Sequence, residues 1–139
     1  MITASKRRLQ GGVEYLGERA NARVWAPACR SVDFVVDANP QHIHAMVRDA
    51  DGFYAADAPV RPGDRYWFRL NGSDLRPDPC SRFQPDGPHG PSQVVDPSSY
   101  AWADGGWKGP ASAGHVIYEM HVGTFTPEGS WAAAARELP

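Results

Sequence analysis

Glu119 and His121 are polar side chains that stand two residues apart in an apolar run near the C-terminal end. If this run is a β-strand, both side chains lie on the same face of it. A carboxylate next to an imidazole could transfer protons or hold a metal ion. Two ligands alone do not make a metal site, so we favour a structural polar network. We therefore expect no metal, no cofactor and no catalytic residue here.

The other polar residues do not form a catalytic pattern. His42 and His44 share one strand face, but no cysteine or third histidine is near them, and we interpret them as surface residues. Three aspartates lie among prolines and glycines, where aspartate favours turns rather than a pair of catalytic carboxylates: Asp74, Asp78 and Asp86. The serines have no G-x-S-x-G setting, and no glycine loop could cradle a phosphate, which excludes nucleotide chemistry.

Three aromatic residues are candidates for binding carbohydrate: Trp25, Trp67 and Tyr54. A flat aromatic ring can stack on the apolar face of a pyranose ring. Each of the three, however, lies in a predicted strand whose neighbours are suitable core residues, and buried aromatic rings are common in small β-sandwiches. No strand face carries a cluster of exposed aromatic residues. We therefore favour a core position for each of them over a sugar-binding one.

The first half of the chain predicts a scaffold of short β-strands. Polar and apolar residues alternate over seven segments separated by turn residues: 13–16, 21–26, 31–37, 42–48, 53–58, 65–70 and 73–76. Asp51-Gly52 and Asn71-Gly72 are typical of hairpin turns. The alternation predicts three apolar strand faces: Val32, Phe34 and Val36; Ile43, Ala45 and Val47; Tyr66, Phe68 and Leu70. This pattern predicts an all-β fold, an immunoglobulin-like antiparallel β-sandwich.

Residues 77–110 are rich in proline and glycine but keep their aromatic side chains. A simple linker or a disordered segment would not keep them. Arg82 and Phe83 are suited to docking against a second domain, the phenylalanine by burial and the arginine by pairing with an acid. Cys29 and Cys80 could form a disulfide, but we favour two free thiols.

The C-terminal part predicts different secondary structure. Residues 115–124 are nearly all apolar and β-prone, which is typical of a strand buried on both faces. From Ser130 to Leu138 the sequence predicts the start of a helix, with Ser130 as the N-cap and four alanines behind it. A strand followed by a helix begins a βα unit, which cannot bury itself alone. We therefore expect the chain to end inside a larger fold.

Two stretches carry a resemblance to a known family. VIYEMHVGTFTPEG, residues 116–129, is similar to the first barrel strand and loop of maltooligosyltrehalose trehalohydrolases. DPCSRFQPDGPHGPSQVVDP, residues 78–97, resembles the connection between the N-terminal sandwich and the barrel in that family. The early motif of Val24 to Pro27, with Ser31-Val32, is shared more broadly with branching and debranching enzymes of the α-amylase superfamily.

The resemblance implies an early-set sandwich over residues 1–76, a connecting loop over 77–114, and the truncated start of a (β/α)8 barrel over 115–139. The parent enzyme would hydrolyse maltooligosyltrehalose and release trehalose with a retaining pair of carboxylates on later barrel strands. This chain would then be an accessory domain without catalytic residues. Its docking residues toward the barrel would be Arg82, Phe83, His89, Glu119 and His121. The alternatives are a stand-alone α-glucan-binding module and the accessory domain of a branching or debranching enzyme.

Composition limits the other partners. The chain has 139 residues and a net charge of −2 with no basic run, so we do not expect nucleic acid binding. No apolar stretch approaches the ~20 residues that span a bilayer, and no signal peptide is recognisable, which favours the cytoplasm. The expected partners are α-1,4-glucan or maltooligosyltrehalose, the catalytic barrel of the same polypeptide, and a second copy through the exposed strand 116–125.

Overall fold

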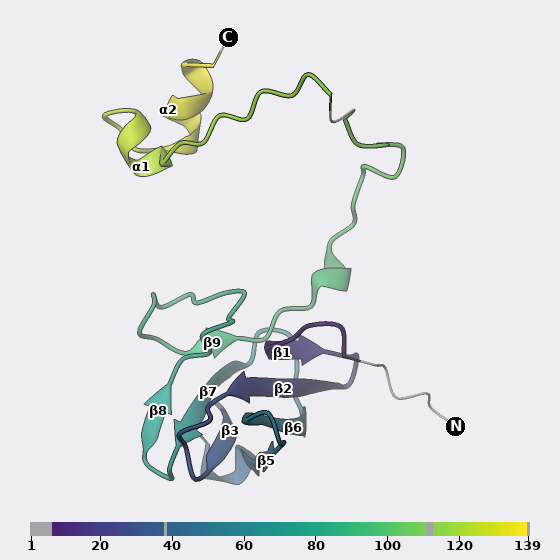
Figure 1. The fold of residues 1–139 in the computed structure, drawn as a ribbon, viewed down its shortest axis with the longest axis vertical. Coiled ribbons are helices and arrows are strands. Elements are labelled where there is room, and N and C mark those ends of the chain that lie inside the picture. Colours follow the sequence, from purple (N-terminus) through teal and green to yellow (C-terminus); the bar gives the residue numbers. More distant parts are fainter. Residues whose placement is uncertain (1–6, 38, 111–112, 139) are drawn as a thin grey trace. The chain divides into compact units, whose positions relative to one another are not determined.

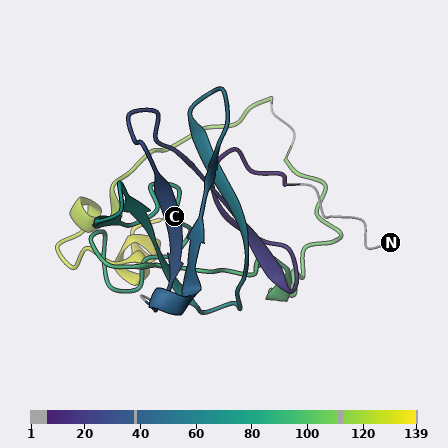
Figure 2. The same ribbon diagram turned by 90° about the horizontal axis from the view of Figure 1, so that it is seen from below.

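The computed structural model describes residues 7–37, 39–110 and 113–138. They form two compact units, of which the first ends at Ala101 and the second begins at Trp102. Figure 1 shows the strands gathered in the first unit and the two α-helices in the second, and Figure 2 shows the same ribbon from below.

The first unit is a sandwich of two antiparallel sheets, which confirms the predicted all-β fold. One sheet has the order β1-β2-β6-β5, with the bounds Gly12–Tyr15, Arg19–Trp25, Phe53–Pro59 and Val47–Arg48. The other has the order β4-β3-β7-β8, with the bounds Ile43–Ala45, Val32–Val36, Arg65–Leu70 and Asp74–Arg76. A short strand β9, Ser92–Gln93, pairs with the start of β7. We call these sheet A and sheet B.

The core lies between the sheets, where the predicted alternation places it. Phe34, Tyr66 and Phe68 are 0%, 2% and 1% exposed. The ring of Phe34 lies 5.4 Å from that of Tyr66 and 6.1 Å from that of Phe68, measured between centroids. These rings come from the adjacent strands β3 and β7, so the same contacts fill the core and fix the strand pairing.

Both predicted hairpin turns are formed. Between β7 and β8, Asn71 and Gly72 have φ angles of 50° and 83°, the left-handed pair that a type I′ turn requires. Between β5 and β6, the Asp49 carboxylate accepts hydrogen bonds from the amides of Asp51 and Phe53, at 3.0 and 2.9 Å. Aspartate in this role closes the turn by replacing a backbone acceptor.

The prediction of one continuous strand over residues 42–48 is wrong. A 3₁₀ turn, η1 (Pro40–His42), comes first, and the chain then crosses from sheet B to sheet A between β4 and β5. Met46 lies at the crossing, and its amide donates to the Val32 carbonyl at 3.0 Å. Its side chain is 8% exposed, whereas Val47 is 77% exposed. The predicted apolar face is therefore not buried, because alternation holds only while a strand stays in one sheet.

The segment after β8 packs on the sandwich as far as a second 3₁₀ turn, η2 (Pro97–Ser99). Val94 is 2% exposed and belongs to the core, and its amide donates to the Asp64 carbonyl at 2.9 Å. Cys29 and Cys80 are both free thiols, as we favoured.

The second unit confirms the predicted helix but not the predicted strand. The helix α2 spans Trp131–Arg136, and the Ser130 hydroxyl caps it by accepting from the Ala133 amide at 3.2 Å. Residues 115–121 have no regular secondary structure, and Val122–Phe125 form a single helical turn, α1. A strand needs a neighbour for its hydrogen bonds, and none of the described residues pairs with this segment. Neither helix is long enough to cross a membrane.

Candidate functional site

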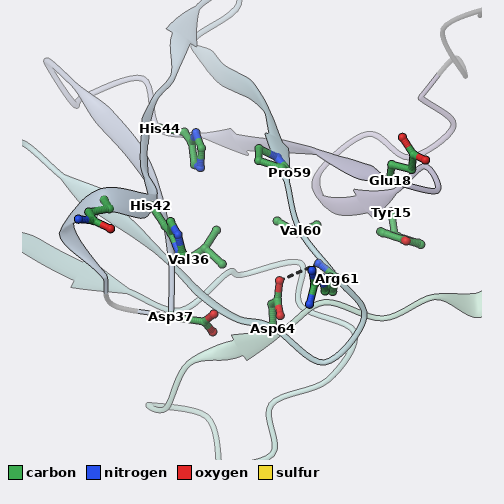
Figure 3. Close-up of a pocket in the computed structure, with 11 residues that line it drawn as sticks. Tyr15, Glu18, Val36, Asp37, His42, His44, Pro59, Val60, Arg61 and Asp64 are labelled. Atoms are coloured by element: carbon green, nitrogen blue, oxygen red, sulfur yellow. Dashed lines mark hydrogen bonds between the residues drawn. The ribbon is translucent and has the colours of Figure 1, made fainter.

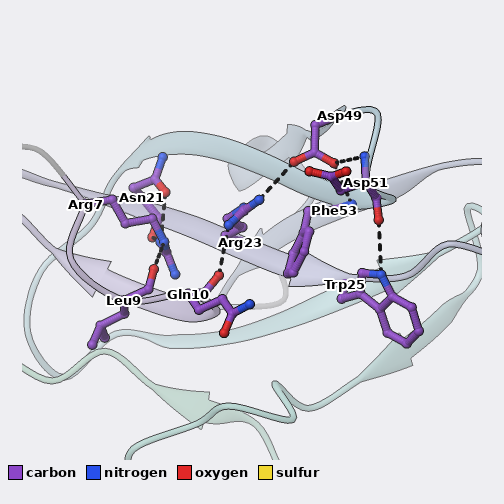
Figure 4. Close-up of polar contacts among 9 residues, drawn as sticks. All are labelled: Arg7, Leu9, Gln10, Asn21, Arg23, Trp25, Asp49, Asp51 and Phe53. Atoms are coloured by element: carbon purple, nitrogen blue, oxygen red, sulfur yellow. Dashed lines mark hydrogen bonds and ion pairs between the residues drawn. The ribbon is translucent and has the colours of Figure 1, made fainter.

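Trp25 is the most exposed aromatic side chain on the strands of the sandwich, with 62% of its surface accessible. It stands at the end of β2, and its indole nitrogen donates to the Asp51 carbonyl at 3.2 Å (Figure 4). The turn that carries this carbonyl contains Gly52, where a Cβ atom would lie 2.9 Å from the Pro27 side chain. The close approach of the turn therefore holds the indole in place while its face stays open to solvent.

A polar and aromatic surface continues from Trp25 along the outer side of sheet A. Phe53 lies opposite Trp25 in the β2–β6 register, and the Arg23 guanidinium stacks 3.8 Å above the centre of the Phe53 ring. Arg23 also pairs with Asp49 at 2.9 Å (Figure 4). This hydrogen bond holds the pKa of Asp49 below its ordinary value. We call the outer surface of Asn21, Arg23, Trp25, Asp49, Phe53 and Asp57 the Trp25 face.

Hydrogen bonds and ion pairs between neighbouring side chains hold the polar groups of the Trp25 face in place. Asn21 donates to Asp57 at 2.8 Å, and the Asn21 amide oxygen accepts from Arg7 at 2.8 Å. Arg19 pairs with Asp57 at 3.2 Å. A flat exposed ring beside fixed donors and acceptors suits a neutral ligand with many hydroxyl groups, because the ring covers apolar C–H bonds while the polar groups bind hydroxyls.

The sequence contained a signal that places Trp25 on the outside. The core side of β2 carries Ala20, Ala22 and Val24, and the alternate positions carry Asn21 and Arg23. Trp25 follows in the polar series, so strict alternation predicts exposure rather than burial. The core position that we favoured for this residue is therefore wrong.

Tyr54, in contrast, lies in the core, the position that we favoured for it. It is 2% exposed, and its hydroxyl donates to the Cys29 carbonyl at 2.6 Å. A ring enclosed in this way has no face on which a sugar could stack.

Trp67 lies on the outer side of sheet B, on the opposite face of the sandwich from Trp25. It is half-buried, opposite Val35 in the β3–β7 register. Next to it, Arg69 and Asp33 form an ion pair at 2.9 Å. Trp25 and Trp67 therefore cannot contact one ring or one short chain of a ligand together.

The predicted docking residues are exposed in both units. Arg82 and His89 lie on the surface of the loop between β8 and β9, and Phe83 there is 51% exposed. In the second unit, Glu119 and His121 are exposed and do not lie on a common strand face, because no strand forms there. Among the described residues, no group of three His, Cys, Asp or Glu side chains could hold a metal ion.

The three aspartates of the loop region do not meet. Asp74 pairs with Arg76 at 3.0 Å, and Asp86 pairs with Arg65 at 3.2 Å. Asp78 is buried and accepts hydrogen bonds from the Tyr66 hydroxyl and the Cys80 amide, both at 2.8 Å. These residues therefore form no pair of catalytic carboxylates.

The sequence did not reveal the buried role of Asp78. Its amide donates to the Ser92 hydroxyl at 3.0 Å, so the network joins β7, β9 and the segment after β8. Burial raises the pKa of Asp78, although the hydrogen bonds from the Cys80 amide and the Tyr66 hydroxyl and the charge of Arg7 oppose the shift. Burial and the nearby Asp78 carboxylate also raise the pKa of Tyr66, which keeps its hydroxyl protonated as a donor.

We expect Tyr66→Phe to lower the free energy of unfolding by about 1.5–3 kcal/mol, because it removes a hydrogen bond to a buried carboxyl group. The matched control is Tyr54→Phe, which removes a hydrogen bond to a neutral carbonyl and should cost about 0.5–1.5 kcal/mol. Urea denaturation of both variants measures the two losses. Equal losses, or a larger loss for Tyr54→Phe, would contradict the structural role of Asp78.

A depression of about 790 Å³ opens at the end of the sandwich where β1, β3 and β6 terminate (Figure 3). His42 and His44, which we interpreted from the sequence as surface residues, both line it. His42 is exposed, whereas His44 is half-buried with its ring centroid 6.3 Å from that of Phe34. Burial, and then the charge of His42, lower the pKa of His44, so its imidazole is neutral at pH 7. We call this depression the end pocket.

The chain is similar to a known protein family and to known enzymes. Residues 11–97 match the family described as carbohydrate-binding module 48, isoamylase N-terminal domain. The chain is 44% identical over 123 residues to a malto-oligosyltrehalose trehalohydrolase of Deinococcus radiodurans, covering 88% of this chain and 20% of that protein. It is 32% identical over 120 residues to the 1,4-alpha-glucan branching enzyme GlgB 2 of Xanthomonas oryzae, covering 76% and 16%.

A solved structure from Salmonella typhimurium, described as an alpha amylase, is also similar. It superimposes with a TM-score of 0.75 at 40% identity, covering 91% of this chain and 22% of that one. The chain thus spans about a fifth of the length of the curated relatives and the solved structure.

Proposed function

The chain belongs to the carbohydrate-binding module 48 family, and we propose that it is the N-terminal accessory domain of a glycoside hydrolase that cleaves maltooligosyltrehalose to release trehalose. The observation that carries this proposal is the length of chain over which the sequence similarity extends. The trehalohydrolase of Deinococcus radiodurans matches over 123 residues, whereas the module spans only residues 11–97. The similarity therefore continues into residues outside the module. The domain itself supports the catalytic part and performs no chemistry.

The second candidate is the accessory domain of a glucan branching enzyme. It is favoured by the match to the Xanthomonas oryzae enzyme, which has a lower identity and covers less of this chain. A stand-alone α-glucan-binding module is the third candidate. Its support is the family membership together with the exposed Trp25 face.

The test of the parent activity begins with the coding frame. Reading it past codon 139 gives the polypeptide that carries this domain, and that polypeptide is assayed for trehalose released from maltooligosyltrehalose. We expect release of trehalose. A polypeptide that forms branches in amylose and releases no trehalose would support the second candidate, and a stop codon would support the third.

We propose further that the Trp25 face is the surface through which this domain contacts α-glucan. Trp25 is 62% exposed and held by the Asp51 carbonyl, and ordered polar groups surround it. Trp67, the other sugar-binding candidate that remains, is half-buried beside Val35. The more open ring is the better platform for a pyranose.

Removal of the Trp25 ring should abolish most of the affinity of the Trp25 face for α-glucan. We expect Trp25→Ala to raise the Kd for maltoheptaose by about 30-fold, the effect of truncating an aromatic anchor worth about 2 kcal/mol. Tryptophan fluorescence titration measures it, with Trp67→Ala as the control that should bind normally. Normal binding by Trp25→Ala and weak binding by Trp67→Ala would move the site to sheet B. A flat response of the unchanged chain up to millimolar maltoheptaose would leave only the supporting role.

We propose that this domain contacts a catalytic barrel in the same polypeptide. The catalytic barrel would begin within residues 115–139, after a sandwich over 1–76 and a connection over 77–114. The first part of this connection, as far as η2, packs on the sandwich. Arg82, Phe83, His89, Glu119 and His121 would contact it, and all five are exposed in this chain. A cytoplasmic location stays a prediction of the sequence. So does association of two copies through residues 116–125, where Val116 and Ile117 are 94% and 90% exposed.

A further inference from the structure

The end pocket has an apolar base that the core holds in place. Val36 and Val60, at the ends of β3 and β6, are only 2% and 4% exposed, and both line it. Tyr15, at the end of β1, is half-buried against the core and adds an aromatic ring to the wall (Figure 3). The volume of about 790 Å³ is within the range of small-molecule sites, about 300–1,000 Å³.

Two carboxylates of the wall are oriented by backbone amides. Asp64 accepts from the Arg61 amide at 2.7 Å, and Asp37 accepts from the Arg65 amide at 2.9 Å. In each case only one carboxylate oxygen is used among the described residues, so the other oxygen can accept a hydrogen bond from a ligand. These acceptors need no rearrangement on binding, which lowers the free-energy cost of binding.

Exposed side chains at the mouth of the end pocket add further donors and acceptors. Gln41 comes from η1. His42 also comes from η1, Glu18 from the β1–β2 turn, and Arg61 from the turn after β6 (Figure 3). The short turn η1 is itself fixed, because the Asn39 side chain accepts from the Gln41 amide at 2.9 Å. Donors and acceptors thus surround an apolar base.

The charges of the end pocket select the kind of ligand. Glu18, Asp37 and Asp64 face one permanent cation, Arg61, so an anion such as phosphate would be repelled. A metal ion is disfavoured as well, since the described residues contain no group of three suitable ligands. An organic cation would make no use of the donors of Gln41 and Arg61. A neutral molecule with hydroxyl groups and apolar C–H faces uses all of these features.

We propose that the end pocket binds a short neutral oligosaccharide, as a second saccharide site separate from the Trp25 face. The choice of α-1,4-linked glucose as the probe rests on the proposed function. The pyranose C–H face covers Tyr15 and the two valines, and the hydroxyls bond to the free oxygens of Asp37 and Asp64.

The test is a titration of the full 139-residue chain with maltotetraose, followed by NMR amide shifts. We expect saturable shifts at Tyr15, Gln41 and Val60, and these should persist in Trp25→Ala. The double variant Gln41→Ala/His42→Ala should raise the Kd of this site about tenfold, the effect of losing two hydrogen bonds. The matched control is His89→Ala, an exposed histidine outside the end pocket, which should bind normally.

Three outcomes would overturn the site. Shifts confined to Trp25 and Phe53 would leave the Trp25 face as the saccharide site and remove the end pocket. Normal binding by the double variant would place the ligand elsewhere. Shifts at Tyr15 and Gln41 with inorganic phosphate, but none with maltotetraose, would show an anion site. None of these outcomes bears on trehalose release by the parent polypeptide, so the failure of this site and that of the proposed function are distinguishable.

Discussion

Phe34→Ala is expected to lower the free energy of unfolding by about 3–5 kcal/mol, the usual effect of removing a fully buried aromatic ring. Phe34 is 0% exposed and packs against Tyr66 and Phe68, so the cavity would open at the centre of the sandwich. Its neighbours belong to paired strands and can collapse into the space only in part.

The matched control for this variant is Phe53→Ala on the outer side of sheet A. Phe53 is only half-buried and lies on the solvent side of the sheet, so its removal should cost less. Urea denaturation compares the two. Phe34→Ala should also admit water to His44 and raise the pKa of this histidine toward its ordinary value, which NMR titration follows. Equal losses of stability in both variants would contradict the assignment of Phe34 to the centre of the core.

The sequence predicted the strands of the sandwich well where local chemistry decides the outcome. Asn71-Gly72 accepts left-handed backbone angles at low cost, so this dipeptide alone indicated the β7–β8 turn. Alternation in β3 and β7 placed Phe34, Tyr66 and Phe68 in the core correctly. Both signals act within a few residues and do not depend on the partner strand.

The prediction failed where the outcome depends on residues far away in the sequence. At Met46 the chain leaves one sheet for the other, and no local pattern marks such a crossing. The burial of Asp78 depends on Tyr66 and Ser92, which lie 12 and 14 residues from it. The apolar run at residues 115–124 lacks a partner strand among the described residues, whereas α2, capped by Ser130, needs only its own residues.

The candidate site shows the same division. Strict alternation along β2 is enough to predict that Trp25 is exposed, although we favoured its burial. The end pocket, in contrast, joins the ends of β1, β3 and β6 with η1, which the sequence separates by up to 49 residues from Tyr15 to Asp64. Only the folded sandwich brings these segments together. A site of this kind is therefore found from the structure and not from a motif.

Gly12→Ala should lower the free energy of unfolding by about 2–5 kcal/mol, because two costs add at this position. Gly12 begins β1 with a φ angle of +81°, which a residue with a Cβ atom adopts only with strain. That Cβ would also lie 3.0 Å from the Cys80 carbonyl oxygen and 3.3 Å from the Asp78 carboxylate. The segment over residues 78–80 cannot stay in place without a shift.

Gly72→Ala separates the two costs. Gly72 has a φ angle of +83°, but nothing lies within 4 Å of its would-be Cβ atom, so only the backbone strain of about 1–2 kcal/mol should appear. Urea denaturation of the two variants gives the difference, which measures how tightly β1 and the Asp78–Cys80 segment approach each other. A loss in Gly12→Ala no larger than that in Gly72→Ala would mean that the segment yields easily. A larger loss means that this contact holds the Asp78 network against β1 and so fixes the segment that follows β8 on the sandwich.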